Sequence, residues 1–244
     1  MAARSWIFLR GLVRGSGHWG DFVELFQAKY PQDEVELIDL PGNGLRFAET
    51  SPTSVAEFVA DLRSRSQSLA QGKKVHLLGL SLGGMIVTEW HRTHPEEVEK
   101  SFLVCTSSAR HARLDERFLP SNYPRLMRIA RMEKGLQQER GIVDLIANNE
   151  ERKNFLLPRL SEHSVACPFK VSNLLRQLWA ASQYQFPDLP PGEVKLIGAH
   201  GDRLVSPQCT LKLAQAWGLQ AVMHPWSGHD LPIDDPNWLL QQLN

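Results

Sequence analysis

The stretch that most constrains this chain is residues 79–84, G-L-S-L-G-G, which contains the pattern G-x-S-x-G. A short apolar run at 75–78 precedes it, and an apolar-rich stretch at 85–90 follows it. A strand, a sharp turn and a helix in this order leave the serine hydroxyl exposed at the carboxyl end of a sheet. Glycines are needed where a Cβ would collide with the neighbouring strand and helix. The alternative is a chance turn, but the flanking runs favour a nucleophile elbow with Ser81 as its nucleophile.

Length and charge narrow the classes of protein to consider. The 244 residues suffice for one large α/β domain with a sizeable core. Lys and Arg together number 27, as do Asp and Glu, so no net charge favours nucleic acid or a membrane surface. Three cysteines form no disulfide framework and no zinc spacing, which predicts a reduced, cytoplasmic protein. The apolar run at 6–9 is too short for a signal peptide or a membrane span.

Apolar runs alternate with helix-period stretches over much of the chain. Strands are expected at 5–9, 34–39, 75–78, 100–105, 193–198 and 220–224. Helices are expected at 18–30, 54–70, 85–94, 210–217 and 237–243. Such alternation indicates a mostly parallel sheet of about six strands, with right-handed crossovers and helices on both faces.

The alternation stops between residues 110 and 187, which leaves 1–109 and 188–244 as the sheet domain. Apolar residues at 171, 174, 175, 178 and 179 follow the spacing of an amphipathic helix. We expect this segment to form a helical cap that covers Ser81 at the carboxyl edge of the sheet. Its apolar side chains either contact substrate or hold the cap helices together, and Trp19 either lines the pocket or fills the core. The candidate substrate contacts are Trp19, Leu126, Ile129, Leu174, Leu178 and Trp179.

Two residues complete a possible catalytic set. Asp202 follows the fifth predicted strand, and His229 lies in the loop after the sixth. Because the strands are parallel, both side chains should emerge at the same sheet edge as Ser81. A serine hydroxyl needs a base within hydrogen-bond reach, and imidazole exchanges protons near neutral pH. A carboxylate such as Asp202 would then orient the imidazole.

In these motifs, and in the order Ser, Asp, His, the chain resembles the α/β-hydrolase fold family over nearly its whole length. More narrowly, it is similar to small carboxylesterases and thioesterases with a helical cap. The resemblance implies an oxyanion hole made by the backbone N–H groups of Leu82 and Leu12. Two departures stand out: Arg10-Gly11 replaces the family's usual His-Gly, and the chain begins almost at the family's third strand, which predicts a trimmed sheet.

The function that this resemblance implies is a serine hydrolase that cleaves a carboxylic ester or thioester through an acyl-enzyme, without cofactor or metal. A dehalogenase is disfavoured, because that relative has an aspartate at the nucleophile position. Two other classes stay open: different chemistry in the same fold, such as a carbon–carbon bond hydrolase or an aminopeptidase, and a catalytically idle hydrolase-like binding protein.

Several further polar residues call for an interpretation. His91 and His94 lack other metal ligands and are expected at a solvated helix end. His18 is expected at the surface or at a helix N-cap, with a place in the pocket lining as the alternative. The aspartates at 230, 234 and 235 are expected as loop or cap groups.

The start of the predicted cap carries a cluster of basic residues. Between residues 109 and 140, eight basic residues stand against four acidic ones. Arg125, Arg128 and Arg131 recur at a spacing of three. They form either a solvated helix face, with stems that cover apolar surface, or a docking patch for an acidic carrier protein.

Overall fold

The computed structural model describes residues 3–244. Its six strands form one sheet in the order β2-β1-β3-β4-β5-β6, and every neighbouring pair is parallel. The predicted parallel sheet of about six strands is therefore confirmed. The strands are β1 (Ser5–Leu9), β2 (Glu34–Leu37), β3 (Val75–Leu80), β4 (Val98–Val104), β5 (Val194–Ala199) and β6 (Ala221–His224).

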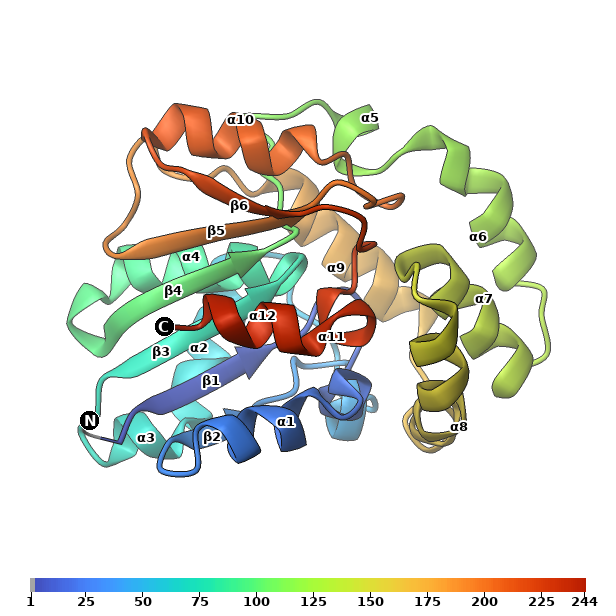
Figure 1. The fold of residues 1–244 in the computed structure, drawn as a ribbon, viewed down its shortest axis with the longest axis horizontal. Helices are drawn as coiled ribbons and strands as arrows, with labels where there is room; N and C mark the ends of the chain where they lie inside the picture. The colour runs from blue at the N-terminus through green and yellow to red at the C-terminus, as the bar shows by residue number, and fades with distance from the viewer. Residues whose placement is uncertain (1–2) are drawn as a thin grey trace.

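Helices cover both faces of the sheet (Figure 1). One face packs against α1 (Phe22–Lys29) and α12 (Pro236–Gln242), and the other packs against α2 (Val55–Arg65), α4 (Leu82–Thr93) and α10 (Gln208–Trp217). The remaining short elements of this part are α3 (Gln67–Ala70), α11 (Leu231–Asp234) and the 3-10 turns η1 (Ser16–Trp19), η2 (Gly44–Arg46) and η3 (Pro95–Glu97).

The interior strand β1, which lies between β2 and β3, is apolar at nearly every position. Trp6 and Phe8 belong to the cluster under α1 and α12, whereas Ile7 and Leu9 belong to the cluster under α2 and α4. Successive strand residues point to opposite faces, so a strand covered on both sides needs apolar residues at every position. This two-sided burial holds the carboxyl ends of the strands, where the candidate site lies, in fixed positions.

Two predicted helices are interrupted. The prediction of one helix over 54–70 is wrong at Ser66, which has extended backbone angles and separates α2 from α3. The Ser66 hydroxyl accepts a hydrogen bond from the N–H of Leu69 and so caps the second helix. The prediction of one helix over 18–30 is wrong at Gly20, whose φ of 63° ends η1 before α1 begins.

Between β4 and β5 the chain forms helices only, and we call residues 110–187 the cap segment. Figure 1 shows its helices α6, α7 and α8 beyond the carboxyl ends of the strands. None of the helices in residues 3–244 is both long enough and apolar enough to cross a membrane. The cap segment contains α5 (Leu114–Arg117), η4 (Pro120–Asn122), α6 (Tyr123–Ile129), α7 (Leu136–Ile146), α8 (Glu150–Ala166) and α9 (Val171–Gln183).

Candidate active site

Ser81 occupies the sharp turn between β3 and α4. Its φ of 59° and ψ of −116° are unusual for a residue with a side chain. The Ser81 N–H donates to the carbonyl of Val104 at 2.9 Å, and the Thr106 hydroxyl donates to the carbonyl of Ser81 at 2.8 Å. These bonds hold the strained turn from both sides. Ser81 is partly exposed although Leu80 and Leu82 are buried, so its side chain can meet a substrate.

The glycines of the turn allow close packing that no other residue permits. A Cβ on Gly79 would lie 2.4 Å from the carbonyl oxygen of Gly83. A Cβ on Gly83 would lie 2.4 Å from the carbonyl oxygen of Leu9, at the end of β1. The turn therefore packs backbone against backbone, as the sequence pattern predicted.

Asp202 and His229 meet at the same sheet edge. The Nδ1 atom of His229 lies 2.7 Å from Oδ2 of Asp202, and both side chains are buried. The other carboxylate oxygen of Asp202 accepts the backbone N–H groups of Leu204 and Val205, each at 2.9 Å. The carboxylate is thus fixed by its own loop, and it holds the imidazole through one oxygen. Asp202 therefore stabilises its own loop and binds His229 at the same time.

A buried thiol adjoins this pair. Ligand atoms of Cys105, Asp202 and His229 lie within 4.8 Å of one another, and together they include donor types that zinc accepts. Burial raises the pKa of the Cys105 thiol well above its usual value, and the nearby Asp202 carboxylate adds to the effect. A metal needs the thiolate, which this environment disfavours. The three residues fit an Asp–His pair with a neighbouring neutral thiol better than a metal site.

Both expected oxyanion donors flank Ser81. Leu82 is the first residue of α4, and the first N–H groups of a helix have no partner within the helix. Leu12 lies in the loop after β1, directly after Gly11. A Cβ on Gly11 would lie 3.0 Å from the Cβ of Ser81, so this loop passes directly beside the serine. The roles of Leu82 and Leu12 stay predictions.

Arg10, at the family's usual histidine position, forms a buried ion pair. Its guanidinium donates to both carboxylate oxygens of Asp230, at 3.1 and 2.5 Å, and the two side chains are 3% and 1% exposed. The guanidinium carbon lies 4.9 Å from the ring centroid of Trp19. This pair connects the loop of Leu12 to the loop of His229. This pair was not predicted from the sequence, although an arginine directly after a buried strand indicates the need for a buried partner.

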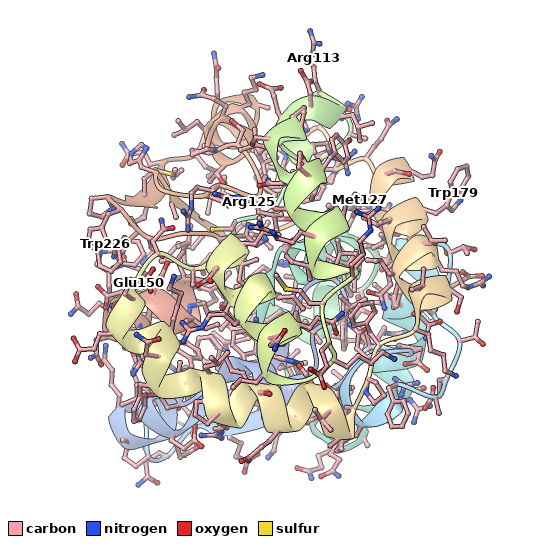
Figure 2. The ribbon with its side chains drawn as sticks, turned by 90° about the vertical axis from the view of Figure 1, so that its right-hand side faces the viewer. Arg113, Arg125, Met127, Glu150, Trp179 and Trp226 are labelled. Carbon is pink, nitrogen blue, oxygen red and sulfur yellow. The ribbon has the colours of Figure 1, made fainter. Side chains whose placement is uncertain are left out.

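The candidate substrate contacts divide into two groups. Trp19 is 1% exposed and packs against Phe8 and Phe22, so it fills the core, the second of its two interpretations. Ile129 is buried with neighbours of the cap segment. Of the others, Leu174 is partly buried, and Leu126, Leu178 and Trp179 are exposed by 38%, 39% and 59%. Figure 2 shows Trp179 on the outer flank of α9, pointing away from the molecule.

Two histidine predictions are wrong. His91 is not solvated: it is buried, and its Nδ1 lies 2.8 Å from the hydroxyl of Ser101. His18 is also buried; its Nδ1 accepts the N–H of Gly15, and its Nε2 lies 3.0 Å from the hydroxyl of Ser164 on α8. Burial, reinforced by the nearby positive charge of Arg14, lowers the pKa of His18 well below its usual value. His18 therefore connects the sheet domain to the cap segment.

Comparison with known proteins identifies the family. Residues 6–242 match the alpha/beta hydrolase family. The chain belongs to the alpha/beta hydrolase family. This match covers nearly the whole chain, and it agrees with the sheet order and the strained serine turn described above.

One curated relative matches part of the chain. Over 97 residues, the sequence is 35% identical to a pimeloyl-[acyl-carrier protein] methyl ester esterase from Chromobacterium violaceum. The match covers 39% of this chain and 36% of that relative. It is a local similarity to an esterase, and it carries no conclusion about the remaining sequence of either protein.

Solved structures share the whole fold at low sequence identity. A meta-cleavage product hydrolase from Pseudomonas fluorescens IP01 superposes with a TM-score of 0.78 and 18% identity, covering 99% of this chain and 89% of that one. A thermophilic esterase from Thermogutta terrifontis superposes with a TM-score of 0.73 and 16% identity, covering 99% and 88%. At such identities the likeness shows the α/β-hydrolase fold alone.

Proposed function

We propose that this member of the alpha/beta hydrolase family is a serine hydrolase that cleaves a carboxylic ester or thioester through an acyl-enzyme. Ser81 is the nucleophile, His229 is the general base and Asp202 orients the base. The observation that carries the proposal is the 2.7 Å contact between His229 and Asp202, made at the sheet edge where Ser81 occupies its strained turn. The local similarity to an esterase supports the choice of ester chemistry.

The geometry supports a two-step acyl transfer. With Nδ1 of His229 engaged by Asp202, Nε2 is the nitrogen that can take the proton of the Ser81 hydroxyl. The serine oxygen attacks the substrate carbonyl, and the resulting oxyanion is bound by the N–H groups of Leu82 and Leu12. His229 then gives its proton to the leaving alcohol or thiol as the carbonyl–oxygen or carbonyl–sulfur bond breaks. A water molecule, activated by the same histidine, attacks the acyl-enzyme and releases the carboxylic acid.

The substrate includes, in our proposal, an acyl group presented by an acidic carrier protein. The curated relative is named for its action on an acyl-carrier-protein ester. Arg125, Arg128 and Arg131 are exposed, and none has an ion-pair partner among residues 3–244. Figure 2 shows Arg125 and Met127 on α6, on the cap side of the molecule. An exposed basic face on the cap segment suits an anionic partner.

The cap segment acts, on this proposal, as a lid over Ser81. Its helices lie beyond the carboxyl ends of the strands, the edge at which the candidate site lies (Figure 1). The helix end of α7 meets the histidine loop, because the N–H of Asp230 donates to the carbonyl of Ile146 at 2.8 Å. A lid in contact with the base loop excludes water from the acyl-enzyme more effectively than an open edge.

The test is active-site labelling followed by substitution. A fluorophosphonate should attach to Ser81, as identified by peptide mass spectrometry, and should fail to label Ser81→Ala. Turnover of short ester and thioester panels should be abolished in Ser81→Ala and should fall about 10⁴-fold in kcat in Asp202→Asn, which favours the wrong histidine tautomer. Unchanged thermal unfolding of both variants serves as the control for folding. Ester turnover that persists in Ser81→Ala would rule out this assignment.

A further inference from the structure

A buried amide of the cap segment contacts the loop that carries the second proposed oxyanion donor. Gln177 lies on α9 and is 0% exposed. Its Oε1 accepts the backbone N–H of Val13 at 2.9 Å. Val13 follows Leu12 and has a φ of 50°, which is strained for a β-branched residue. The hydrogen bond from α9 thus holds the backbone of Val13 in this strained conformation.

The same amide reaches the loop through a second side chain. Nε2 of Gln177 donates to Oδ1 of Asn43 at 2.6 Å. Nδ2 of Asn43 donates in turn to the carbonyl oxygens of Gly11 at 3.3 Å and Arg14 at 3.1 Å. The backbone N–H of Arg14 also donates to Gly11, at 3.4 Å. A chain of hydrogen bonds therefore runs from α9 to the peptide group that precedes Leu12.

Because the peptide group is planar, these contacts also fix the direction of the proposed oxyanion donor, the N–H of Leu12. The carbonyl of Gly11 and the N–H of Leu12 belong to one peptide group, and residues 3–244 contain no cis peptide bond. In a trans peptide the C=O and the N–H point in opposite directions. The hydrogen bonds that hold the Gly11 carbonyl therefore fix the direction of the Leu12 N–H. The next peptide group is held through the Val13 N–H, so both sides of Leu12 are restrained.

Helix α9 buries polar side chains and exposes apolar ones, which is the reverse of the usual pattern. Amphipathic helices normally bury their apolar face. Here the polar residues Asn173 and Gln177 are buried, whereas Val171, Leu175 and Trp179 are more than half exposed. A buried amide is stabilising only when its donors and acceptors are paired, and the core loops supply the partners of Gln177.

We propose that Gln177 is a positioning residue for the oxyanion hole. With Asn43, it holds the Leu12 peptide in the orientation that the developing negative charge requires, so the hole depends on the docking of α9 against the core. An oxyanion donor accelerates the reaction when its direction is fixed before the charge develops. This inference rests on the proposed function.

A matched pair of substitutions on α9 provides the test. Gln177→Met keeps the length of the side chain and removes every hydrogen bond to the loop. Asn173→Leu is the control: Asn173 is also buried on α9; it accepts the N–H of Ser51 at 3.0 Å and donates to the carbonyl of Glu49 at 2.8 Å, but it forms no hydrogen bond with residues 11–14. Both variants weaken cap docking, and only the first releases the oxyanion loop.

Steady-state kinetics and inhibitor binding report the difference. We expect Gln177→Met to lower kcat about 10- to 100-fold, less than the complete loss of a donor, with KM within about three-fold of wild type. Affinity for a trifluoromethyl ketone, whose adduct with serine carries the oxyanion, should fall by the same factor as kcat. The product carboxylate should bind as in the wild type. Asn173→Leu should lower kcat and ketone affinity by less than about three-fold each.

A conservative pair covers the case in which Gln177→Met does not fold. Gln177→Glu keeps an acceptor for Val13 and loses the donor to Asn43 and to the hydroxyl of Ser51. Asn173→Asp makes the same chemical change at the control site. A parallel loss of kcat and ketone affinity in Gln177→Glu alone supports the inference. Equal effects in the two variants, or a wild-type kcat in either Gln177 variant, would overturn it. If the wild-type protein neither reacts with a fluorophosphonate at Ser81 nor hydrolyses any ester, the proposed function itself fails.

Discussion

The sheet core and the boundary between core and cap are held together differently. Inside the sheet domain, apolar side chains fill both faces, as Trp6, Phe58 and Phe102 illustrate with exposures of 0%. At the boundary, apolar contacts such as that of Ile233 with α7 and α8 are joined by buried polar ones: Arg14 of the first loop forms an ion pair with Glu139 of α7 at 2.7 Å. The cap segment meanwhile leaves large apolar side chains such as Met127 and Phe155 more than half exposed.

The two kinds of contact differ in how precisely they position the groups that they join. Apolar burial is favourable wherever shapes fit, whereas a buried ion pair or amide is favourable only when its partners are correctly placed. Asp234 illustrates the second kind, because one carboxylate oxygen accepts the N–H groups of Asn148 and Asn149, each at 2.7 Å, and the other accepts that of Gly228 at 2.6 Å. The directional hydrogen bonds of the boundary therefore fix both the position and the orientation of the cap segment relative to the loop of His229.

The largest effect on stability is expected from the core. Phe102→Ala removes a fully buried ring that packs 5.3 Å from the ring of Trp6. A large-to-small change of this kind costs about 3–5 kcal/mol of unfolding free energy. The whole molecule should lose stability together, with a Tm lowered by about 10 °C for a chain of this size. Denaturant unfolding followed by far-UV circular dichroism measures this, and an unchanged midpoint would contradict the assignment of this region as the core.

A change at the boundary should act locally. Glu139→Ala leaves the buried guanidinium of Arg14 without its carboxylate, a defect that costs about 3–5 kcal/mol where it cannot be relieved. Here relief is available, because movement of α7 away from the loop exposes Arg14 to water. We expect limited proteolysis within residues 110–187 to accelerate at least ten-fold, while the core unfolding midpoint changes less than in Phe102→Ala.

The control for this change is an exposed ion pair across the same boundary. Arg159 of α8 and Glu24 of α1 form a 2.6 Å pair whose side chains are 53% and 56% exposed. Exposed pairs contribute about 0–1 kcal/mol, so Glu24→Gln should leave the proteolysis rate nearly unchanged. Equal acceleration in Glu139→Ala and Glu24→Gln would contradict the distinction between buried and exposed boundary contacts.

The sequence predicted the core better than the boundary, and the reason is physical. Apolar periodicity and the glycine turn depend on neighbours along the chain, so Ser81, Asp202 and His229 could be placed at one edge from strand order alone. The pairing of Arg10 with Asp230 spans 220 positions, and no local pattern encodes it. The burial of Gln177 contradicts the periodicity of its own helix, because its partners come from distant loops.

The boundary should also respond to acid. His18 and His163 lie with ring centroids 4.7 Å apart, and burial lowers the pKa of each below its usual value. As pH falls below about 6.5, the unfolded chain binds protons that the folded boundary does not, so stability is retained above that pH and lost below it. A single histidine changes the unfolding free energy by no more than about 1.4 kcal/mol per pH unit.

The measurement compares Tm at pH 7.5 and pH 5.5 in the wild type and in His18→Asn, whose Oδ1 can still accept the N–H of Gly15. We expect a decrease of a few degrees in the wild type, at about 2–4 °C per kcal/mol, and a smaller decrease in the variant. His76, His91 and His111, whose pKa values are also lowered by burial, contribute equally to both proteins. Identical pH responses would contradict the lowered pKa of His18, because they would mean that His18 binds protons equally in the folded and the unfolded chain.

The smallest effect concerns the outer surface of the cap segment, where charges are exposed and screened. If Arg125, Arg128 and Arg131 attract an acidic carrier protein, kcat/KM for a carrier-bound ester should fall as salt rises, because the Debye length shrinks from about 10 Å at 0.1 M to about 3 Å at 1 M. A neutral small ester should show almost no salt dependence, since no charge is steered.

Replacement of all three arginines by Gln should lower kcat/KM for the carrier-bound ester at low salt and flatten its salt dependence, while leaving Tm and the turnover of the neutral ester unaffected. If both substrates respond to salt in the same way, and the triple substitution does not change that response, these arginines form only a solvated helix face. The cap segment would then act on catalysis through its boundary with the core and not through its outer surface.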